Sequence, residues 1–280
     1  MESFCILCNQ PTAHKGLYQT LKRCRICSLV SAKEDPGQEE LAGVYGKDYF
    51  FEGEYLNYLE EKEPLQKNFR KWIPLLKQFV PHGKLFEIGS AYGFFLELAQ
   101  KQWEVKGVDI SGPACEYGKS QGLNVECGDF LDIPVEAAQY NVFCLWDTIE
   151  HLQKPHLYIR KISETIAPGG IICLTTGDID ALVPRMQGGK WRMIHPPSHL
   201  FYFSKKTLFA LLRKNDFEIV HASHAGFYRS LKRVLFSLAV LRKNGKWKAL
   251  YESYNRLKLR DFCFYLNLFD ILLVIARKGS

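Results

Sequence analysis

The chain has 280 residues, of which 47% are hydrophobic and 24% charged, and its formal net charge is +7. This composition excludes a disordered or fibrous protein and leaves room for one large domain with a small appendage. The longest apolar stretch, residues 262–276, is interrupted by Asn267 and Asp270 and is too short for a transmembrane helix. The basic excess permits an anionic partner without requiring one. It gathers between Arg229 and Arg260, where Glu252 is the single acid.

The chain begins with four cysteines in a metal-binding pattern: two C-x2-C turns, separated by fifteen residues, formed by Cys5, Cys8, Cys24 and Cys27. Four thiolates on two tight turns suit tetrahedral zinc, and about thirty residues cannot fold on a hydrophobic core alone. The turn formers Asn9, Pro11 and Gly16 and the strand formers in residues 17–21 predict a two-stranded hairpin. We therefore expect a structural zinc ribbon over residues 1–35.

No signal peptide precedes Cys5, and the remaining cysteines lie singly within apolar segments. Both features favour reduced thiols over disulfides, and therefore a cytoplasmic protein.

Residues 36–82 are predicted to form a linker followed by an aromatic and helical segment that ends near Val80. Within it, Tyr49 and its aromatic neighbours Tyr45 and Phe50 are expected either to cover a cationic ligand or to clasp the amino-terminal segment onto the core.

From Lys84 onward, predicted strands alternate with predicted helices, which indicates a parallel, doubly wound α/β sheet covered on both faces. We expect one domain over residues 83–280, with a basic helical insertion at residues 229–268, where leucines recur at helical spacing. Ser204 is a predicted N-cap. The predicted strands are 84–88, 105–110, 124–127, 140–146, 170–176, 217–221 and 270–277, and the predicted helices are 94–102, 113–121, 155–166 and 204–214.

A glycine turn follows the first of these strands. Gly89 ends the strand and Gly93 opens the next helix, so the backbone can approach a nucleotide-like ligand at the helix N-terminus. Asp109 ends the second strand, where a carboxylate can accept hydrogen bonds from ribose hydroxyls. Gly128 and Asp129 follow the third strand. They and the four-residue step between the first two glycines count against a nicotinamide-dependent dehydrogenase, the competing interpretation.

Over residues 84–220, and in the last strand, these motifs resemble class I S-adenosylmethionine-dependent methyltransferases. The resemblance implies a seven-stranded, Rossmann-like sheet in which Glu87 faces the methionine amino group, Asp109 holds the ribose and Asp129 binds the adenine. One departure is Ala91, which replaces the middle glycine of the motif and would weaken cofactor binding if the loop requires a positive φ there. The cofactor contacts implied are Tyr49, Glu87, Gly89, Ser90, Gly93, Asp109, Ile110, Asp129, Phe130 and Trp146.

Two histidine-containing clusters follow later strands and should meet at the carboxyl edge of the sheet. The first runs from Asp147 to His151 and the second from His195 to His199. Glu150, His151, His195 and His199 are the candidate catalytic residues, because methyl transfer requires alignment and removal of a proton. The first cluster resembles the E-x-x-E-H run of metal-assisted O-methyltransferases, which implies Asp147, Glu150, His151 and His199 as ligands of a divalent cation. A metal-free histidine base, as in sugar C-methyltransferases with a zinc ribbon, and a purely structural role are the alternatives.

Three functions remain open. The favoured one is methylation of a small biosynthetic intermediate at oxygen or carbon, for example of a sugar nucleotide, with the basic insertion holding an anionic or phosphorylated group. The second is RNA methylation that uses the ribbon and the basic insertion. The third is a non-catalytic binding protein. Residues 229–260 could also form an amphipathic contact with a protein or a membrane surface.

Overall fold

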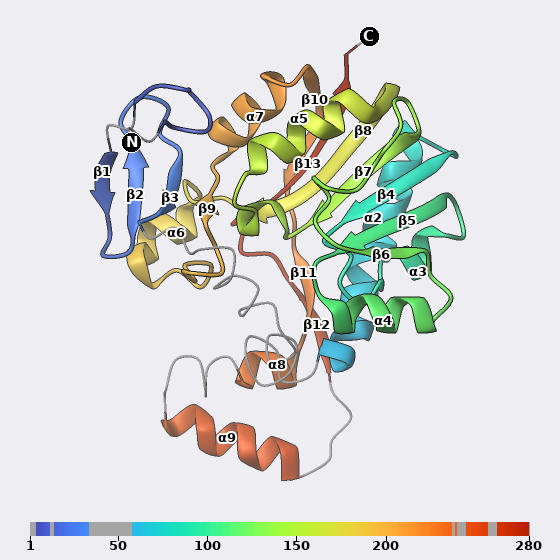
Figure 1. The fold of residues 1–280 in the computed structure, drawn as a ribbon. Coiled ribbons are helices and arrows are strands. Elements are labelled where there is room, and N and C mark those ends of the chain that lie inside the picture. Colours follow the sequence, from blue (N-terminus) through green and yellow to red (C-terminus); the bar gives the residue numbers. More distant parts are fainter. Residues whose placement is uncertain are drawn as a thin grey trace.

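A seven-stranded sheet lies at the centre of the computed structural model, which describes residues 4–11, 14–33, 58–236, 239, 245–256 and 262–279 (Figure 1). The strand order is β10-β13-β8-β7-β4-β5-β6. Strands β8, β7, β4, β5 and β6 pair in parallel, and β13 is antiparallel to both of its neighbours. The bounds are β4 Lys84–Ile88, β5 Glu104–Asp109, β6 Val125–Cys127, β7 Tyr140–Trp146, β8 Ile166–Gly177, β10 Phe217–His224 and β13 Ile271–Lys278. The predicted mostly parallel, doubly wound sheet is confirmed.

Helices cover both faces of this sheet. Buried residues of α5 (Pro155–Thr165) and α7 (Lys205–Arg213) pack with Phe86 in one core cluster. Buried residues of α2 (Lys62–Phe79), α3 (Leu96–Ala99) and α4 (Gly112–Ser120) pack with Leu85 in another. Phe86 and Leu85 point to opposite faces because side chains alternate along a strand. A strand buried on both sides explains the nearly continuous apolar sequences of β7 and β8.

Most predicted elements appear within a few residues of their expected bounds. The predicted N-cap Ser204 begins α7, and its hydroxyl accepts a hydrogen bond from the Thr207 N–H in a capping box. The helix predicted at 94–102 is shorter, since only Leu96–Ala99 is α-helical. Shorter elements are α6 (Leu182–Gln187) and the 3-10 turns η2 (Tyr58–Glu61), η3 (Ile149–His151) and η4 (Gly188–Lys190).

The cysteine segment forms three short strands, β1 (His14–Leu17), β2 (Leu21–Cys24) and β3 (Val30–Ala32). The turn between β1 and β2 lies within the segment predicted as strand, with Tyr18 at φ 57°. A fourth strand, β9 (Phe201–Tyr202), comes from the large domain and pairs with β3, so that this sheet has the order β1-β2-β3-β9. Figure 1 shows the blue strands of the ribbon beside β9 and α6.

The basic insertion combines a β-hairpin with helices. Strand β11 (Phe227–Ser230) pairs with β12 (Cys263–Leu266), and α8 (Leu231–Phe236) and α9 (Gly245–Arg256) lie between them in the chain. The leucine spacing predicted the helical part and gave no signal for the two strands. Among the residues that the structure describes, no helix is both long and apolar enough to cross a membrane.

Candidate active site

A cavity of about 1130 Å³ opens at the carboxyl ends of β4, β5 and β7. The predicted residues that line it are Glu87, Gly89, Ser90, Asp109, Ile110, Asp129, Phe130, Trp146, Glu150, His151, His195 and His199. Gly93 is not among the lining residues. Tyr49, with Tyr45 and Phe50, lies outside the described residues. The fold therefore brings the two histidine clusters and the glycine turn to one space.

The glycine turn requires glycine at both of its ends. Gly89 has φ 74°, and a Cβ atom there would lie 2.6 Å from the Thr148 hydroxyl oxygen. Gly93 has φ 75°, and a Cβ atom would collide with the Leu123 side chain. These are conformations and spaces that only glycine accepts without strain. The role of Gly93 is thus to let the turn enter the helix rather than to line the cavity.

Asp109 ties the glycine turn to the end of β5. One carboxylate oxygen accepts the Ala91 N–H at 2.7 Å, and the other accepts the Ser111 N–H at 2.9 Å. Burial raises the pKa of this carboxyl, and the backbone donors of Ser111 and Ala91 oppose that rise. Each oxygen has a second lone pair, so the carboxylate can hold the loop and still accept hydrogen bonds from vicinal hydroxyl groups.

Asp129 occupies the corresponding place after β6. Its Oδ1 atom accepts the Leu131 N–H at 2.7 Å and the Tyr158 hydroxyl at 2.5 Å. Those two bonds fix the direction of the carboxylate, while Phe130, only 1% exposed, packs edge-on against Phe86 beside it. The arrangement leaves the other carboxylate oxygen available for an amino group of a planar ring.

Glu87 carries an unsatisfied oxygen at the base of the cavity. Within the described part of the chain its Oε2 atom is buried and has no hydrogen-bond partner. Burial raises the pKa of Glu87 well above its usual value, and the nearby negative charge of Asp109 adds to this. A buried carboxylate oxygen without a partner is costly, and a cationic amino group at this place would remove the cost. The residues present therefore fit the amino group of S-adenosylmethionine.

The affinity for S-adenosylmethionine is expected to rise with pH because of Glu87. If its raised pKa leaves part of the Glu87 population protonated, binding of a cationic amino group must expel that proton. Affinity then increases by up to about tenfold per pH unit below the raised pKa and levels off above it, until the amino group of the ligand loses its own proton. Isothermal titration at about pH 5 and pH 7 should show the tighter binding at the higher pH. Glu87→Gln should bind more weakly and lack this dependence. Equal slopes for both proteins would contradict the assignment.

Ala91 adopts a left-handed backbone conformation, with φ 44°. The loop does require a positive φ at this position, where the Cβ atom of alanine makes the left-handed conformation unfavourable. The hydrogen bond from the Ala91 N–H to Asp109 stabilises this strained backbone conformation. The chain thus retains the turn of the family's motif with a residue that is not the preferred one.

Ala91→Gly should therefore stabilise the protein. Removal of the Cβ strain is expected to raise the free energy of unfolding by about 0.5–1 kcal/mol, after the greater flexibility of glycine in the unfolded chain is subtracted. Urea denaturation measures the change. Ala114→Gly, within α4, is the matched control and should lower stability by about 1 kcal/mol. A loss of stability in both variants would mean that Ala91 is not strained.

The two histidine clusters meet at the carboxyl edge of the sheet. The ring centres of His151 and His199 are 4.5 Å apart and the two rings are nearly perpendicular, and the ring centres of His195 and His199 are 5.5 Å apart. The Nδ1 atom of His151 lies 2.9 Å from the Ser198 carbonyl oxygen. Burial lowers the pKa of His199 well below its usual value, and the neighbouring His151 and His195 add to this. His199 is therefore a neutral imidazole near pH 7, able to accept a proton.

Glu150 lies within the same cluster. It is 2% exposed, and its Oε2 atom accepts the Thr176 hydroxyl at 2.9 Å. Potential metal-ligating atoms of Glu150, His151 and His199 all lie within 4.8 Å of one another. Asp147 is not part of this group: its Oδ1 atom accepts the Thr175 hydroxyl at 2.8 Å. The structure thus assembles three of the four residues considered as cation ligands.

Several lining residues were not anticipated from the sequence. Phe69 and Trp72 reach the cavity from α2, and Trp72 stacks on Trp146 at 4.8 Å between ring centres. Phe227 of β11 meets Trp72 edge-on at 5.4 Å. The step of three residues between Phe69 and Trp72 marks one face of a helix, but it does not tell a core face from a cavity wall. These rings form an aromatic wall of the cavity.

A second wall is built around Asp270. Its carboxylate accepts the Trp191 indole N–H at 2.9 Å and pairs with Arg192 through the two terminal nitrogens of the guanidinium group. Asp270 is 1% exposed, and this pairing neutralises a charge that would otherwise be costly to bury. Trp191 also lines the cavity.

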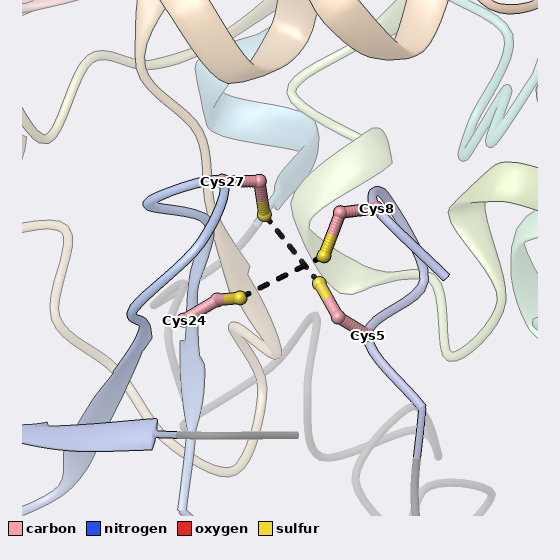
Figure 2. Close-up of side chains that lie close together, drawn as sticks. All are labelled: Cys5, Cys8, Cys24 and Cys27. Atoms are coloured by element: carbon pink, nitrogen blue, oxygen red, sulfur yellow. Dashed lines mark hydrogen bonds between the residues drawn. The ribbon is translucent and has the colours of Figure 1, made fainter. Parts of the chain in front are cut away.

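The four amino-terminal cysteines converge from their two turns (Figure 2). The sulfur atoms of Cys5 and Cys27 are 3.5 Å apart, and those of Cys8 and Cys24 are 3.8 Å apart. Tetrahedral zinc with bonds of about 2.3 Å requires sulfur separations of about 3.8 Å. All four are free thiols. The donor set and its spacing therefore fit a structural zinc ion.

Comparison with known proteins agrees with this geometry. Residues 62–222 match a family model described as a methyltransferase domain. The ubiquinone biosynthesis O-methyltransferase of Bordetella avium is 25% identical over 116 residues, or 38% of this chain and 47% of the relative. That of Acinetobacter baumannii is 26% identical over 127 residues, or 42% and 52%. The chain thus spans about half the length of these curated relatives.

Solved structures share the fold. A SAM-dependent methyltransferase from Thermotoga maritima has a TM-score of 0.53 at 17% identity, and the match covers 83% of this chain and all of that one. A geranyl diphosphate methyltransferase in complex with SAM has a TM-score of 0.51 at 15% identity, covering 76% and 85%. Because the family model spans more than half of the 280 residues, the chain belongs to the methyltransferase-domain family.

Proposed function

We propose that the chain methylates a small anionic biosynthetic intermediate, with a phosphorylated sugar or sugar nucleotide as the favoured class. The observation that carries this proposal is the distribution of charge in the cavity. Near the glycine turn, the lining acids are Glu87, Asp109, Asp129 and Asp132. The other charged residues that line the cavity are the cations Lys154, Lys190, Arg192, Arg229 and Arg233 and the acids Asp147, Glu150 and the paired Asp270.

Two of the cations, Arg229 and Arg192, lie close enough to Asp147 to act on its carboxyl group. Burial raises the pKa of Asp147, whereas the positive charges of Arg229 and Arg192 lower it, so both guanidinium groups act on the space beside Asp147. Arginine is well suited to bind phosphate or carboxylate because its donors match their geometry. An acid-lined half for a cationic cofactor and a base-lined half for an anionic acceptor would bring the two reactants together.

In the proposed reaction, the acceptor lies between the cofactor sulfur and the histidine cluster. Bound S-adenosylmethionine supplies an electrophilic methyl group. Neutral His199, or His151 beside it, would remove the acceptor's proton, and the aromatic wall of Trp72 and Trp146 would exclude water. The curated relatives are named for O-methylation, which favours oxygen over carbon as the acceptor atom.

A divalent cation is the alternative means of activating the acceptor. Two imidazoles and a carboxylate are a known catalytic ligand set, and Glu150, His151 and His199 would provide them. A chelator that abolishes turnover while leaving the ribbon zinc and the S-adenosylmethionine affinity intact would support this mechanism. Full activity in chelator would support the metal-free base.

The substrate class is tested by following S-adenosylhomocysteine formation with a panel of acceptors. Phosphorylated sugars and sugar nucleotides should be methylated, while their neutral counterparts should react at least about tenfold more slowly. Arg229→Ala should raise the KM for the anionic acceptor and leave the affinity for S-adenosylmethionine unchanged. Labelled methyl groups in RNA, with affinity falling steeply as salt increases, would instead support the RNA methyltransferase. Cofactor binding without any transfer would support the non-catalytic protein.

A further inference from the structure

The zinc ribbon and the histidine cluster belong to one hydrogen-bonded unit. We infer that the ribbon is a positioning element, which holds the segment His195–Leu200, and with it Glu150 and His151, in the arrangement needed for methyl transfer. The catalytic part of this inference rests on the proposed function, whereas the structural part stands independently of it.

A backbone route connects the ribbon to Glu150. Val30 and Ser31 of β3 pair with Tyr202 and Phe201 of β9. The next residue of β3, Ala32, donates its N–H to the Leu200 carbonyl oxygen at 2.8 Å. Leu200 in turn donates its own N–H to the Glu150 carbonyl oxygen at 2.8 Å. Leu200 is therefore hydrogen-bonded to the ribbon through its carbonyl oxygen and to Glu150 of the first histidine cluster through its N–H.

The residues just before Leu200 complete the link. The His199 N–H bonds to the His195 carbonyl oxygen at 3.0 Å, which closes a turn. Within this turn the Ser198 carbonyl oxygen lies 2.9 Å from His151 Nδ1 and sets the orientation of that ring. Displacement of Leu200 would therefore move His199 directly and would release His151 from its acceptor.

Apolar packing adds a second connection, to the Trp191 wall. Leu21 and Val30 of the ribbon are fully buried against Ile179, Trp191 and Tyr202. Trp191 is also the residue that donates to Asp270 at the cavity wall. The ribbon therefore contacts two loops that line the cavity, and its inner face is covered by the large domain.

Zinc provides the stability that this support requires. Strands of three or four residues do not persist alone in water, and the free energy of zinc binding is folding free energy for such a module. Removal of the metal should therefore loosen β3, β9 and the histidine segment together. The glycine turn lies on other strands, so the affinity for S-adenosylmethionine should change little.

Ala32→Pro tests the link, because proline lacks the N–H that bonds to Leu200. That N–H is directed at β9 and not at β2, so the ribbon can keep its own pairing. Gly16→Ala on the outer strand β1 is the control, since an added Cβ there meets no atom within 4 Å. Zinc content, S-adenosylmethionine affinity, turnover and amide hydrogen exchange at Leu200 are measured in both variants.

In Ala32→Pro we expect bound zinc, cofactor affinity within about twofold of wild type, exchange at Leu200 at least about tenfold faster and turnover at least about tenfold slower. The control should match wild type. Should Ala32→Pro lose its zinc, the wild-type protein treated with chelator provides the same exchange measurement. Unchanged exchange at Leu200 in the zinc-free protein would overturn the inference. Because exchange needs no acceptor, failure of the proposed function would leave this result interpretable.

Discussion

Asp109→Ala is expected to reduce the affinity for S-adenosylmethionine by about a hundredfold. The substitution removes the carboxylate that we propose accepts two ribose hydroxyls, and charge-assisted hydrogen bonds contribute about 1.5–3 kcal/mol each. It also leaves the N–H groups of Ala91 and Ser111 without the acceptor they have now. The free energy of unfolding should therefore fall by about 1–3 kcal/mol as well.

Calorimetric titration and urea denaturation measure these two effects. Asp132→Ala is the matched control, because Asp132 also lines the cavity but is exposed. It should change cofactor affinity by less than about threefold, as expected for a solvated charge. Should Asp109→Ala bind the cofactor as tightly as wild type, the ribose would have to lie elsewhere in the cavity.

His199→Gln is expected to lower kcat by about a hundredfold or more, with little change in cofactor affinity. General base catalysis contributes about 10²–10⁴-fold, and it requires the unprotonated ring nitrogen that His199 has near pH 7. Glutamine preserves much of the volume and one hydrogen-bonding group, so the buried turn should remain folded. A metal-ligand role would predict the same loss, and the chelator experiment separates the two mechanisms.

The control for this variant is His221→Gln, which alters a histidine of β10 outside the cavity. His221 bonds to Ser223 on the same strand, and its substitution should leave kcat unchanged. Equal activity of His199→Gln and wild type would assign His199 a structural role. The catalytic proton would then have to be taken by His151 or His195.

The half of the site that we assign to the cofactor, formed by the glycine turn and the neighbouring carboxylates, could be predicted because its residues lie close together in sequence. Glu87, Gly89 and Asp109 each stand at the end of a strand whose apolar pattern is evident, and parallel strands bring those ends together. The turn residues also report their own backbone requirement. Only the sign of φ at Ala91 needed the structure, since alanine by itself indicates neither region.

The half of the site that we assign to the methyl acceptor could not be predicted to the same degree, because it is formed by segments that are far apart in the sequence. Trp72, Phe227 and Asp270 come from segments far apart in the chain, and their sequence patterns are those of ordinary core positions. The pairing of β3 with β9 involves strands of three and two residues, too short to leave an alternating pattern. The position of Asp147 relative to Glu150 depended on its hydrogen bond to Thr175 in the neighbouring strand.

The placement of β13 has a consequence for how the protein is made. This strand comes last among the described elements, yet it lies between β8 and β10 and pairs with both. Until residues 271–278 leave the ribosome, two long strand edges stay open, and open edges can pair with other chains. The sheet should therefore be complete only after β13 has been synthesised, and a nascent chain truncated before β13 should aggregate or require a chaperone.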